Sequence, residues 1–276
     1  MGFNGGEAGG DACAPGQRSG RISLILTNMN LLSNKTALIT GGSRGIGRAI
    51  VLAMAAEGAD VAFTYLHRKD SADEVAHEVE NMGRRCLAIQ ADASDYPTTE
   101  QVVSRVLETF GQIDILVNNA GITRDSLLMR MDETQWDAVI TANLKAAFNF
   151  CKLVSTHRMR RRTGAIINIS SVVGLFGNAG QCNYAASKGA LISLTKSLSK
   201  EIGPRGVRVN SIAPGFIMTE MTQALPDEVR EQWIQDIALR RAGQPEDVAN
   251  VAVFLASDKA AYITGEVINV SGNIKS

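Results

Sequence analysis

Short apolar runs alternate with amphipathic segments from residue 34 to the end of the chain. The apolar runs, which predict strands, are 36–40, 60–65, 86–91, 114–117, 165–169, 207–212 and 267–270. The segments between them predict helices over 48–57, 71–82, 97–110, 134–162 and 183–202. Continuous apolar strands that alternate with helices are typical of a parallel sheet covered on both faces. We therefore expect an α/β fold: one doubly wound domain with a seven-stranded parallel sheet and helices on both faces.

The first 33 residues do not follow this pattern. Glycines are frequent as far as Gly20, which favours a flexible segment that buries little. The apolar run 22–26 is too short for a secretory leader with its cleavage site. We expect residues 1–33 to be a flexible N-terminal tail and residues 34–276 to form the domain. Within the domain, the segment 216–239 is expected to be a mobile lid over the substrate.

Composition narrows the classes of function. The 28 basic and 28 acidic residues give a net charge of +0, which provides no overall attraction to nucleic acid or to an anionic membrane. No apolar run approaches the ~20 residues of a membrane span. Cys13, Cys86, Cys151 and Cys182 are scattered, which indicates neither a disulfide framework nor a metal site. We expect a cytoplasmic globular protein that binds no metal, nucleic acid or membrane.

The sequence TGGSRGIG (residues 40–47) lies between the first strand and the first helix, where a dinucleotide-binding loop belongs. Gly41 permits a tight turn, Gly45 lets the backbone approach phosphates, and Gly47 allows close packing of helix on strand. The N-terminus of the helix offers free N–H groups and a partial positive charge to a pyrophosphate. The spacing is GxxxGxG rather than the general GxGxxG, so a glycine turn without a ligand is the alternative. The loop predicts a Rossmann-type cofactor site.

Charge after the second strand indicates which nicotinamide cofactor binds. NAD-binding proteins usually place Asp or Glu there to hold the ribose 2′-hydroxyl. Here residues 64–67 read TYLH, without a carboxylate. Arg44 in the glycine loop, together with Arg68 or Lys69, can instead pair with a 2′-phosphate through charge-assisted hydrogen bonds. We therefore predict NADP(H).

Tyr184 and Lys188 lie four residues apart in a predicted helix, so their side chains share one face. A free tyrosine ionises near pH ~10, and a nearby ammonium favours the phenolate and lowers that pKa. A tyrosine of this kind can exchange a proton with a carbonyl or alcohol oxygen. Taken alone, the spacing is more often an ordinary surface pair, so the catalytic interpretation depends on the motifs around it.

Four motifs stand in one order along the chain: TGGSRGIG, NNAG, ISS before VVG, and YAASK. Together they resemble the short-chain dehydrogenase/reductase family, and the likeness extends from about residue 34 to the C-terminus. The resemblance is most specific to the 3-oxoacyl-[acyl-carrier-protein] reductases of that family in the stretches 118–131, 169–189 and 210–222. It implies NADPH-dependent reduction of a 3-oxoacyl thioester, linked to acyl carrier protein, to the 3-hydroxyacyl thioester in fatty-acid synthesis.

The resemblance also implies roles for individual residues. Tyr184 would protonate the substrate carbonyl oxygen, Ser171 would hydrogen-bond the same oxygen, and Lys188 would hold the nicotinamide ribose and lower the tyrosine pKa. Asn143 would bind a water that links Lys188 to solvent, and Ser170 is the competing candidate for the serine role. The other residues implied to contact the cofactor are Gly41, Ser43, Arg44, Gly45, Ile46, Gly47, Asp92, Ala93, Asn119, Ala120, Gly121, Pro214, Gly215 and Ile217.

Partners follow from the same resemblance. It implies a homotetramer, and it implies that acyl carrier protein presents the substrate. Arg162 and Arg205 match family positions that receive this acidic carrier. The basic cluster at 157–162 has a second explanation, because cations stabilise a helix C-terminus. The chain departs from the family at residues 271–273 (SGN), where an acidic-glycine ending is usual.

Other functions stay open from the sequence. A family member that acts on acetoacetyl-CoA, a sugar or another ketone or alcohol would share these motifs. An enoyl reductase usually spaces its tyrosine and lysine further apart than YxxxK. A non-catalytic cofactor-binding protein is expected to have a damaged Ser–Tyr–Lys set, whereas the set is complete here.

Overall fold

The computed structural model describes residues 1–2, 30–223 and 227–275, without the side chains of 158–161, 221 and 229. Within these residues seven parallel strands form one sheet, in the order β3-β2-β1-β4-β5-β6-β7. The strands are β1 (Thr36–Ile39), β2 (Asp60–Tyr65), β3 (Cys86–Gln90), β4 (Ile115–Asn118), β5 (Gly164–Ile169), β6 (Val207–Pro214) and β7 (Val267–Val270). The chain builds outward from β1 to β3, returns to β4 beside β1, and then builds outward to β7. Ligands of such sheets bind beyond the carboxyl ends of the strands at this switch point between β1 and β4.

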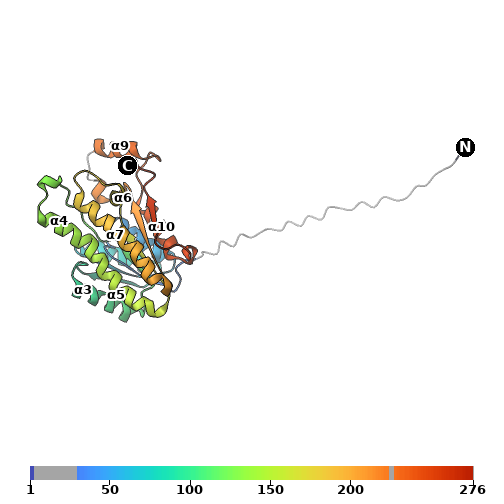
Figure 1. Ribbon diagram of the computed structural model, residues 1–276. Helices are drawn as coiled ribbons and strands as arrows, with labels where there is room; N and C mark the ends of the chain where they lie inside the picture. The colour runs from blue at the N-terminus through green and yellow to red at the C-terminus, as the bar shows by residue number, and fades with distance from the viewer. Residues whose placement is uncertain (3–29, 224–226, 276) are drawn as a thin grey trace.

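Helices cover both faces of the sheet (Figure 1). The longer ones are α1 (Gly45–Ala56), α2 (Lys69–Asn81), α3 (Tyr96–Phe110), α4 (Glu133–Ile140), α5 (Ala146–Arg161), α7 (Cys182–Ile202), α9 (Asp227–Asp236) and α10 (Pro245–Ala256). Two helices of one turn, α6 (Val173–Phe176) and α8 (Glu220–Gln223), follow β5 and β6. The predicted α/β class and the seven parallel strands are confirmed. In the described part of the chain, no helix has the length and apolar character needed to span a membrane.

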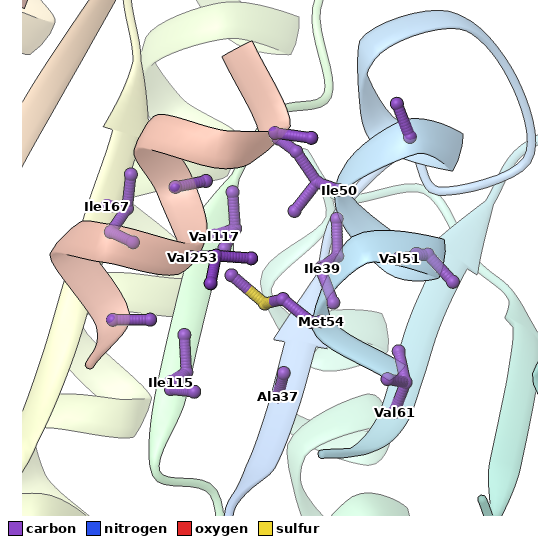
Figure 2. Close-up of a cluster of buried hydrophobic side chains, with 14 of the residues drawn as sticks. Ala37, Ile39, Ile50, Val51, Met54, Val61, Ile115, Val117, Ile167 and Val253 are labelled. Carbon is purple, nitrogen blue, oxygen red and sulfur yellow. The ribbon is translucent and has the colours of Figure 1, made fainter. Parts of the chain in front are cut away.

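Alternate residues of the central strands point to opposite faces, as the two-residue period of a strand requires. In β1, Ala37 and Ile39 belong to the core beneath α1, α2 and α10, whereas Leu38 belongs to the core beneath α3 and α5. Figure 2 shows the first of these cores, where Ile50 and Met54 of α1 and side chains of α10 meet those of the strands. Burial of one such side chain contributes about 1.5–3 kcal/mol to the stability of the fold. Because each core contains many of them, the two cores together hold in place the strand ends that carry the site.

The domain begins a few residues before the expected boundary at residue 34. Leu32 is fully buried in the core beneath α1, and its N–H donates to the Glu57 carbonyl at 2.9 Å. The N–H of Leu31 donates to the Glu57 carboxylate at 3.0 Å. Two leucines next to a polar segment have no periodicity, so the pattern could not assign them to the domain. Residues 3–29 of the expected tail lie outside the described residues.

The predicted helix over 134–162 is made of three consecutive pieces. A π-helical turn, Thr141–Lys145, separates α4 from α5. Such turns insert one extra residue into a helix and are frequent at functional sites. This turn carries Asn143 toward the loop that follows β4. Hydrophobic periodicity could not reveal the turn, because one inserted residue shifts the pattern only locally.

The segment after β6 carries α8 and α9, and its residues 224–226 lie outside the described residues. The rings of Phe216 and Trp233 contact each other with centroids 5.3 Å apart, and with Ile237 they form a small separate core. Ile237 also pairs in antiparallel fashion with Ile274, near the end of the chain. The C-terminal residues therefore fix one end of this segment. That the segment moves as a lid stays a prediction.

Candidate active site

A pocket of about 260 Å³ opens at the carboxyl ends of β4, β5 and β6. Its walls come from the segments that follow these three strands and from the first turns of α1 and α7. The predicted site residues that line it are Ile46, Asn119, Gly121, Ser171, Tyr184, Lys188, Pro214, Gly215 and Ile217. Residues spread over more than 170 positions of sequence thus meet beside the switch point of the sheet.

Lys188 lies next to Tyr184 on the first turns of α7. Its ammonium nitrogen is 5.7 Å from the centroid of the tyrosine ring. The side chain is only 4% exposed and donates a hydrogen bond to the Ile169 carbonyl at 2.9 Å. Because Ile169 ends β5, this bond ties α7 to the strand that leads to Ser171. The four-residue spacing therefore delivers both side chains to one pocket.

Burial governs the protonation of this pair. It lowers the pKa of Lys188 to about 8. Burial also raises the pKa of Tyr184, although a hydrogen bond with Ser171 acts in the opposite direction, and the Asp125 carboxylate adds to the rise. Loss of water around the phenol is the largest cause, so the tyrosine pKa is raised overall, and the expected lowering by Lys188 stays a prediction. Tyr184 is a protonated donor at neutral pH.

The two candidate serines after β5 have different surroundings. The Ser170 hydroxyl donates to the Ile212 carbonyl of β6 at 3.1 Å, so its proton is not available to a ligand in the pocket. The Ser171 hydroxyl accepts from the Val173 N–H at 3.1 Å, which leaves its proton available to the pocket and to Tyr184. This difference favours Ser171 for a role that requires a donor.

Asn143 is 1% exposed and clamps the loop that follows β4. Its Oδ1 accepts from the Ile122 N–H at 2.7 Å, and its Nδ2 donates to the Ile122 carbonyl and to Ser187 Oγ, both at 3.0 Å. Ser187 in turn donates to the Tyr184 carbonyl at 2.8 Å. Asn143 therefore links the π-helical turn to the helix that carries the tyrosine. The water-binding role expected for it stays a prediction.

Asn183 makes a second clamp that the motifs do not single out. It is fully buried, and its Oδ1 accepts from the Tyr184 N–H at 2.7 Å. Its Nδ2 donates to the carbonyls of Arg124 at 3.0 Å and Gln135 at 3.3 Å. The first turn of α7 is thereby joined to the loop after β4 and to α4. An asparagine before a tyrosine is too common a pair to indicate this role in a sequence.

The glycine loop contains close approaches that only glycine permits. A Cβ on Gly47 would lie 2.0 Å from the Gly41 carbonyl oxygen, so α1 can pack on β1 only with glycine at this position. Gly41 and Gly45 have φ of 69° and 52°, in the left-handed region. Gly42, which the motif did not single out, is also required, since its Cβ would lie 2.6 Å from that of Phe63. This bare loop before the N-terminus of α1 fits a pyrophosphate.

The NNAG motif joins the glycine loop to the π-helical turn. The Thr40 hydroxyl accepts from the N–H groups of Asn119 at 3.0 Å and Ala120 at 2.9 Å. The Asn119 amide donates back to the Thr40 carbonyl at 3.0 Å. A Cβ on Gly121 would lie 2.9 Å from Asn143 Oδ1, so glycine admits the clamp described above. These bonds hold the ends of β1 and β4 at a fixed separation.

The far wall of the pocket is built by the residues that end β6 and follow it. Pro214 is the last residue of β6, and a Cβ on Gly215 would lie 2.6 Å from that of Ser271. Ile217 is buried beside them. Trp233 also lines the pocket. A single tryptophan in an amphipathic segment carries no signal that separates a packing residue from a pocket residue.

Asp92, Ala93 and Ser43 are among the predicted cofactor contacts that do not line the pocket. Asp92 is exposed after β3, and its carboxylate accepts from the N–H and the hydroxyl of Ser94 at 2.9 and 2.7 Å. The Ala93 carbonyl accepts from the Thr99 hydroxyl at 3.2 Å. Ser43 is half-buried in the glycine loop. All three lie near the carboxyl ends of β1 and β3, and their contact with the cofactor stays a prediction.

Arg44 and Arg68 face a common carboxylate. Glu220 Oε2 lies 3.8 Å from Arg44 Nη1 and 2.7 Å from Arg68 Nη1. Lys69, the alternative to Arg68, pairs instead with Asp73 at 2.5 Å. The structure therefore brings the two arginines together and leaves the lysine out of the group.

Arg162 and Arg205 lie at the opposite edge of the sheet. Arg162 precedes β5 and Arg205 precedes β6, so both stand at the amino ends of strands. Arg162 Nη2 donates to the Pro204 carbonyl at 3.3 Å. A cavity of about 320 Å³ also lies at this edge, and it contains none of the predicted catalytic or cofactor residues. Within one subunit the two arginines do not border the active-site pocket.

The parallel sheet, the glycine loop at its switch point and the Ser–Tyr–Lys group in the adjacent pocket define a nicotinamide-dependent oxidoreductase. The family description "Enoyl-(Acyl carrier protein) reductase" matches residues 41–273. The chain belongs to the short-chain dehydrogenase/reductase family.

Its relatives include several enzymes of one name. The chain is 51% identical to the 3-oxoacyl-[acyl-carrier-protein] reductase FabG of Staphylococcus aureus over 240 residues, which cover 87% of this chain and 98% of the relative. It is 46% identical to that of Thermotoga maritima over 243 residues, covering 88% and 98%. The crystal structure of 3-oxoacyl-[acyl-carrier protein] reductase from Brucella melitensis matches with a TM-score of 0.84 at 33% identity, covering 89% of this chain and 92% of that one.

Proposed function

We propose that the protein reduces a 3-oxoacyl thioester carried by acyl carrier protein to the 3-hydroxyacyl thioester in fatty-acid synthesis, with NADPH as reductant, in the cytoplasm. The observation that carries this proposal is the meeting of Ser171, Tyr184 and Lys188 in one pocket beside the glycine loop. The chain that contains this pocket is 46–51% identical to several reductases of that name. The intact catalytic group argues against a non-catalytic cofactor-binding protein, and the YxxxK spacing argues against an enoyl reductase.

Reduction of a ketone requires a hydride for the carbon and a proton for the oxygen. When bound, NADPH supplies the hydride. Ser171 and Tyr184 direct two hydrogen-bond donors at the carbonyl oxygen and stabilise the negative charge that develops there. The Tyr184 hydroxyl then transfers its proton to this oxygen, which becomes the 3-hydroxyl group. The raised pKa of Tyr184 keeps the proton in place until that charge develops.

Lys188 stabilises the tyrosinate that the transfer leaves behind. With a pKa of about 8, it is mostly protonated at neutral pH, and its ammonium lies close to the ring. Its bond to the Ile169 carbonyl keeps it at the floor of the pocket, where it also holds the nicotinamide ribose. Asn143 positions the loop and the helix on either side, and a water near it returns a proton from solvent.

Arg44 and Arg68 select NADPH over NADH. The two guanidinium groups converge beyond the ends of β1 and β2, where the adenosine ribose lies in Rossmann-type folds. Each can donate charge-assisted hydrogen bonds to a 2′-phosphate. The end of β2 provides no carboxylate for a ribose 2′-hydroxyl.

The enzyme works as a homotetramer that receives the acidic carrier at Arg162 and Arg205. Both arginines stand at the sheet edge opposite the pocket of their own subunit. The proposal therefore requires that a carrier bound there serve the pocket of a neighbouring subunit. Trp136 of α4 and Phe148 of α5 are exposed apolar side chains that suit packing between subunits.

The test is NADPH oxidation with the acetoacetyl group on acyl carrier protein, on CoA and in simple ketones. We expect the highest kcat/KM with the carrier-linked substrate, and turnover of every substrate lowered by about 10²–10⁴-fold in Tyr184→Phe. A free ketone or sugar that is turned over as well as the carrier-linked substrate would contradict the proposal. Combined Arg162→Glu and Arg205→Glu substitutions should lower turnover of the carrier-linked substrate alone, and unchanged turnover would remove the docking role.

A further inference from the structure

One carboxylate stands inside the cationic group that faces the cofactor site. Glu220, the first residue of α8, places a single oxygen 2.7 Å from Arg68 and 3.8 Å from Arg44. The three residues come from the segment after β6, the segment after β2 and the glycine loop, so only the fold brings them together. Roughly half of each side chain is exposed, and the group is therefore open to a ligand from solvent.

The backbone at Arg68 supports a special role for this group. Arg68 has φ 60° and ψ 63°, a left-handed conformation that residues other than glycine, asparagine and aspartate rarely adopt. This conformation stands directly before α2, where an ordinary N-cap would be extended. Sparsely populated backbone conformations cluster at ligand-binding sites, where the surrounding structure maintains them.

The start of α8 is held against the glycine loop by its own turn. The Thr219 N–H donates to the Thr222 hydroxyl at 2.7 Å, and this hydroxyl donates to the Ile217 carbonyl at 2.7 Å. A Cβ on Gly45 would lie 3.5 Å from Thr219 Cγ2, so the turn sits directly on the loop. Glu220 is therefore presented to the arginines by a fixed backbone and not only by a long side chain.

We infer that Glu220 is an internal counter-ion that determines how strongly the enzyme prefers NADP(H) over NAD(H), an inference that rests on the proposed function of Arg44 and Arg68. A 2′-phosphate carries about −1.5 to −2 charges and requires the guanidinium groups of Arg68, which donates a hydrogen bond to Glu220, and of Arg44, which forms an ion pair with it. The phosphate must displace the carboxylate, and like charges repel while both remain nearby. A 2′-hydroxyl has no charge and leaves the ion pairs in place. Glu220 thus weakens the binding of NADP(H) and leaves the binding of NAD(H) unchanged.

The experiment measures binding without catalysis. Calorimetric titrations of the full-length protein with adenosine 2′,5′-bisphosphate and with 5′-AMP are compared for wild type, Glu220→Gln and Glu78→Gln. Glu78 is the matched control, because it also pairs with an arginine, Arg48, at 2.7 Å and is exposed to a similar degree. We expect Glu220→Gln to tighten the bisphosphate about three- to tenfold at low salt, to change 5′-AMP less than about twofold, and to lose the difference at high salt. Glu78→Gln should change neither ligand by that amount.

The outcomes separate this inference from the proposal beneath it. If wild type prefers the bisphosphate but Glu220→Gln binds it equally or more weakly, the counter-ion role is wrong and the NADPH assignment stands. Equal tightening of both ligands would likewise overturn the role, since the effect would then not involve the 2′-phosphate. If wild type binds the two ligands equally, the NADPH assignment fails and takes the inference with it. Thermal unfolding of each variant checks that it is folded.

Discussion

The ammonium of Lys188 lies 5.7 Å from the centroid of the Tyr184 ring, and burial reverses the ordinary order of the two pKa values. The lysine pKa falls to about 8 while the tyrosine pKa rises. At neutral pH the pair therefore holds two protons, one on each group. In this state the Tyr184 hydroxyl can donate its proton to the oxygen of a ketone.

Tyr184→Phe is expected to lower kcat by about 10²–10⁴-fold, the usual range for loss of a positioned proton donor. The substitution removes one hydroxyl and keeps the ring, so KM for the thioester should change far less. Steady-state NADPH oxidation measures both constants. Tyr262→Phe is the control, because Tyr262 is fully exposed and should behave as wild type. A Tyr184→Phe variant with wild-type kcat would exclude the proton donor.

Lys188→Met is expected to stabilise the fold while it removes activity. The lysine pKa is about 8 when folded, against 10.5 as the ordinary value. Between these values the unfolded chain binds a proton that the folded protein does not, so wild-type stability rises with pH across this window and the penalty is complete below pH 8. The free energy of unfolding of the methionine variant should exceed that of wild type by about 2–3 kcal/mol at pH ~7. Above the pKa of the lysine in the unfolded chain, the two free energies should be almost equal.

Urea unfolding at neutral and at alkaline pH measures this difference. Lys196→Met serves as the control, since Lys196 is an exposed residue of the same helix. A Lys188→Met variant that is less stable than wild type at both pH values would show that the buried ammonium does not carry the expected penalty.

Asn183→Asp is expected to weaken both the fold and the reaction. The aspartate can still accept from the Tyr184 N–H, but it cannot donate to the carbonyls of Arg124 and Gln135. Leaving buried acceptors unpaired costs about 1–3 kcal/mol each. The free energy of unfolding, measured in urea, and kcat/KM should both fall. Asn178→Asp, on the exposed surface, should change neither quantity appreciably. Unchanged kcat/KM would mean that the clamp does not position Tyr184.

Gly47→Ala should disrupt the glycine loop far more than Gly45→Ala. The new Cβ at position 47 would lie 2.0 Å from the Gly41 carbonyl oxygen, whereas the one at position 45 meets only Thr219 at 3.5 Å. We expect Gly47→Ala to lower the free energy of unfolding by about 3 kcal/mol or more. Gly45→Ala should lower it by about 1–2 kcal/mol, because the backbone at this position is left-handed. Urea unfolding and NADPH binding report the two effects. Equal losses would contradict the packing role assigned to Gly47.

Arg68→Ala should raise KM for NADPH about tenfold and leave KM for NADH unchanged, because one charge-assisted hydrogen bond to the 2′-phosphate is lost. Lys69→Ala should change neither constant, since that lysine pairs with Asp73. Steady-state kinetics with both cofactors distinguishes the two variants. If Lys69→Ala has the larger effect, the cationic group has been assigned to the wrong residue.

The predictable part of this protein is the part that follows from periodicity and from local spacing. Apolar runs located all seven strands of the sheet, and the glycine loop and the Tyr184–Lys188 spacing located the pocket. Leu32 joined the core although its surroundings in sequence are polar, because burial depends on what packs against it. The π-helical turn at Asn143 was also beyond the pattern, since it depends on contacts with the loop after β4.

Contacts between distant residues explain the remaining differences. The raised pKa of Tyr184 depends on the depth of the pocket, and no spacing of residues encodes that depth. The approach of Glu220 to Arg68 joins residues 152 positions apart. The residues close to β2 and the glycine loop therefore account for only part of the charge near the expected cofactor site.

The antiparallel pairing of Ile237 with Ile274 makes the last few residues part of the frame that carries Trp233 over the pocket. Two further hydrogen bonds extend this antiparallel pairing, from the Ala238 N–H to the Asn273 carbonyl and from the Lys275 N–H to the Asp236 carbonyl. Truncation of the chain after Ser271 would remove these bonds and release the segment that carries Trp233. Tyr184 and Lys188 would stay in place. Such a shortened enzyme should lose selectivity among acyl groups before it loses the ability to reduce a ketone.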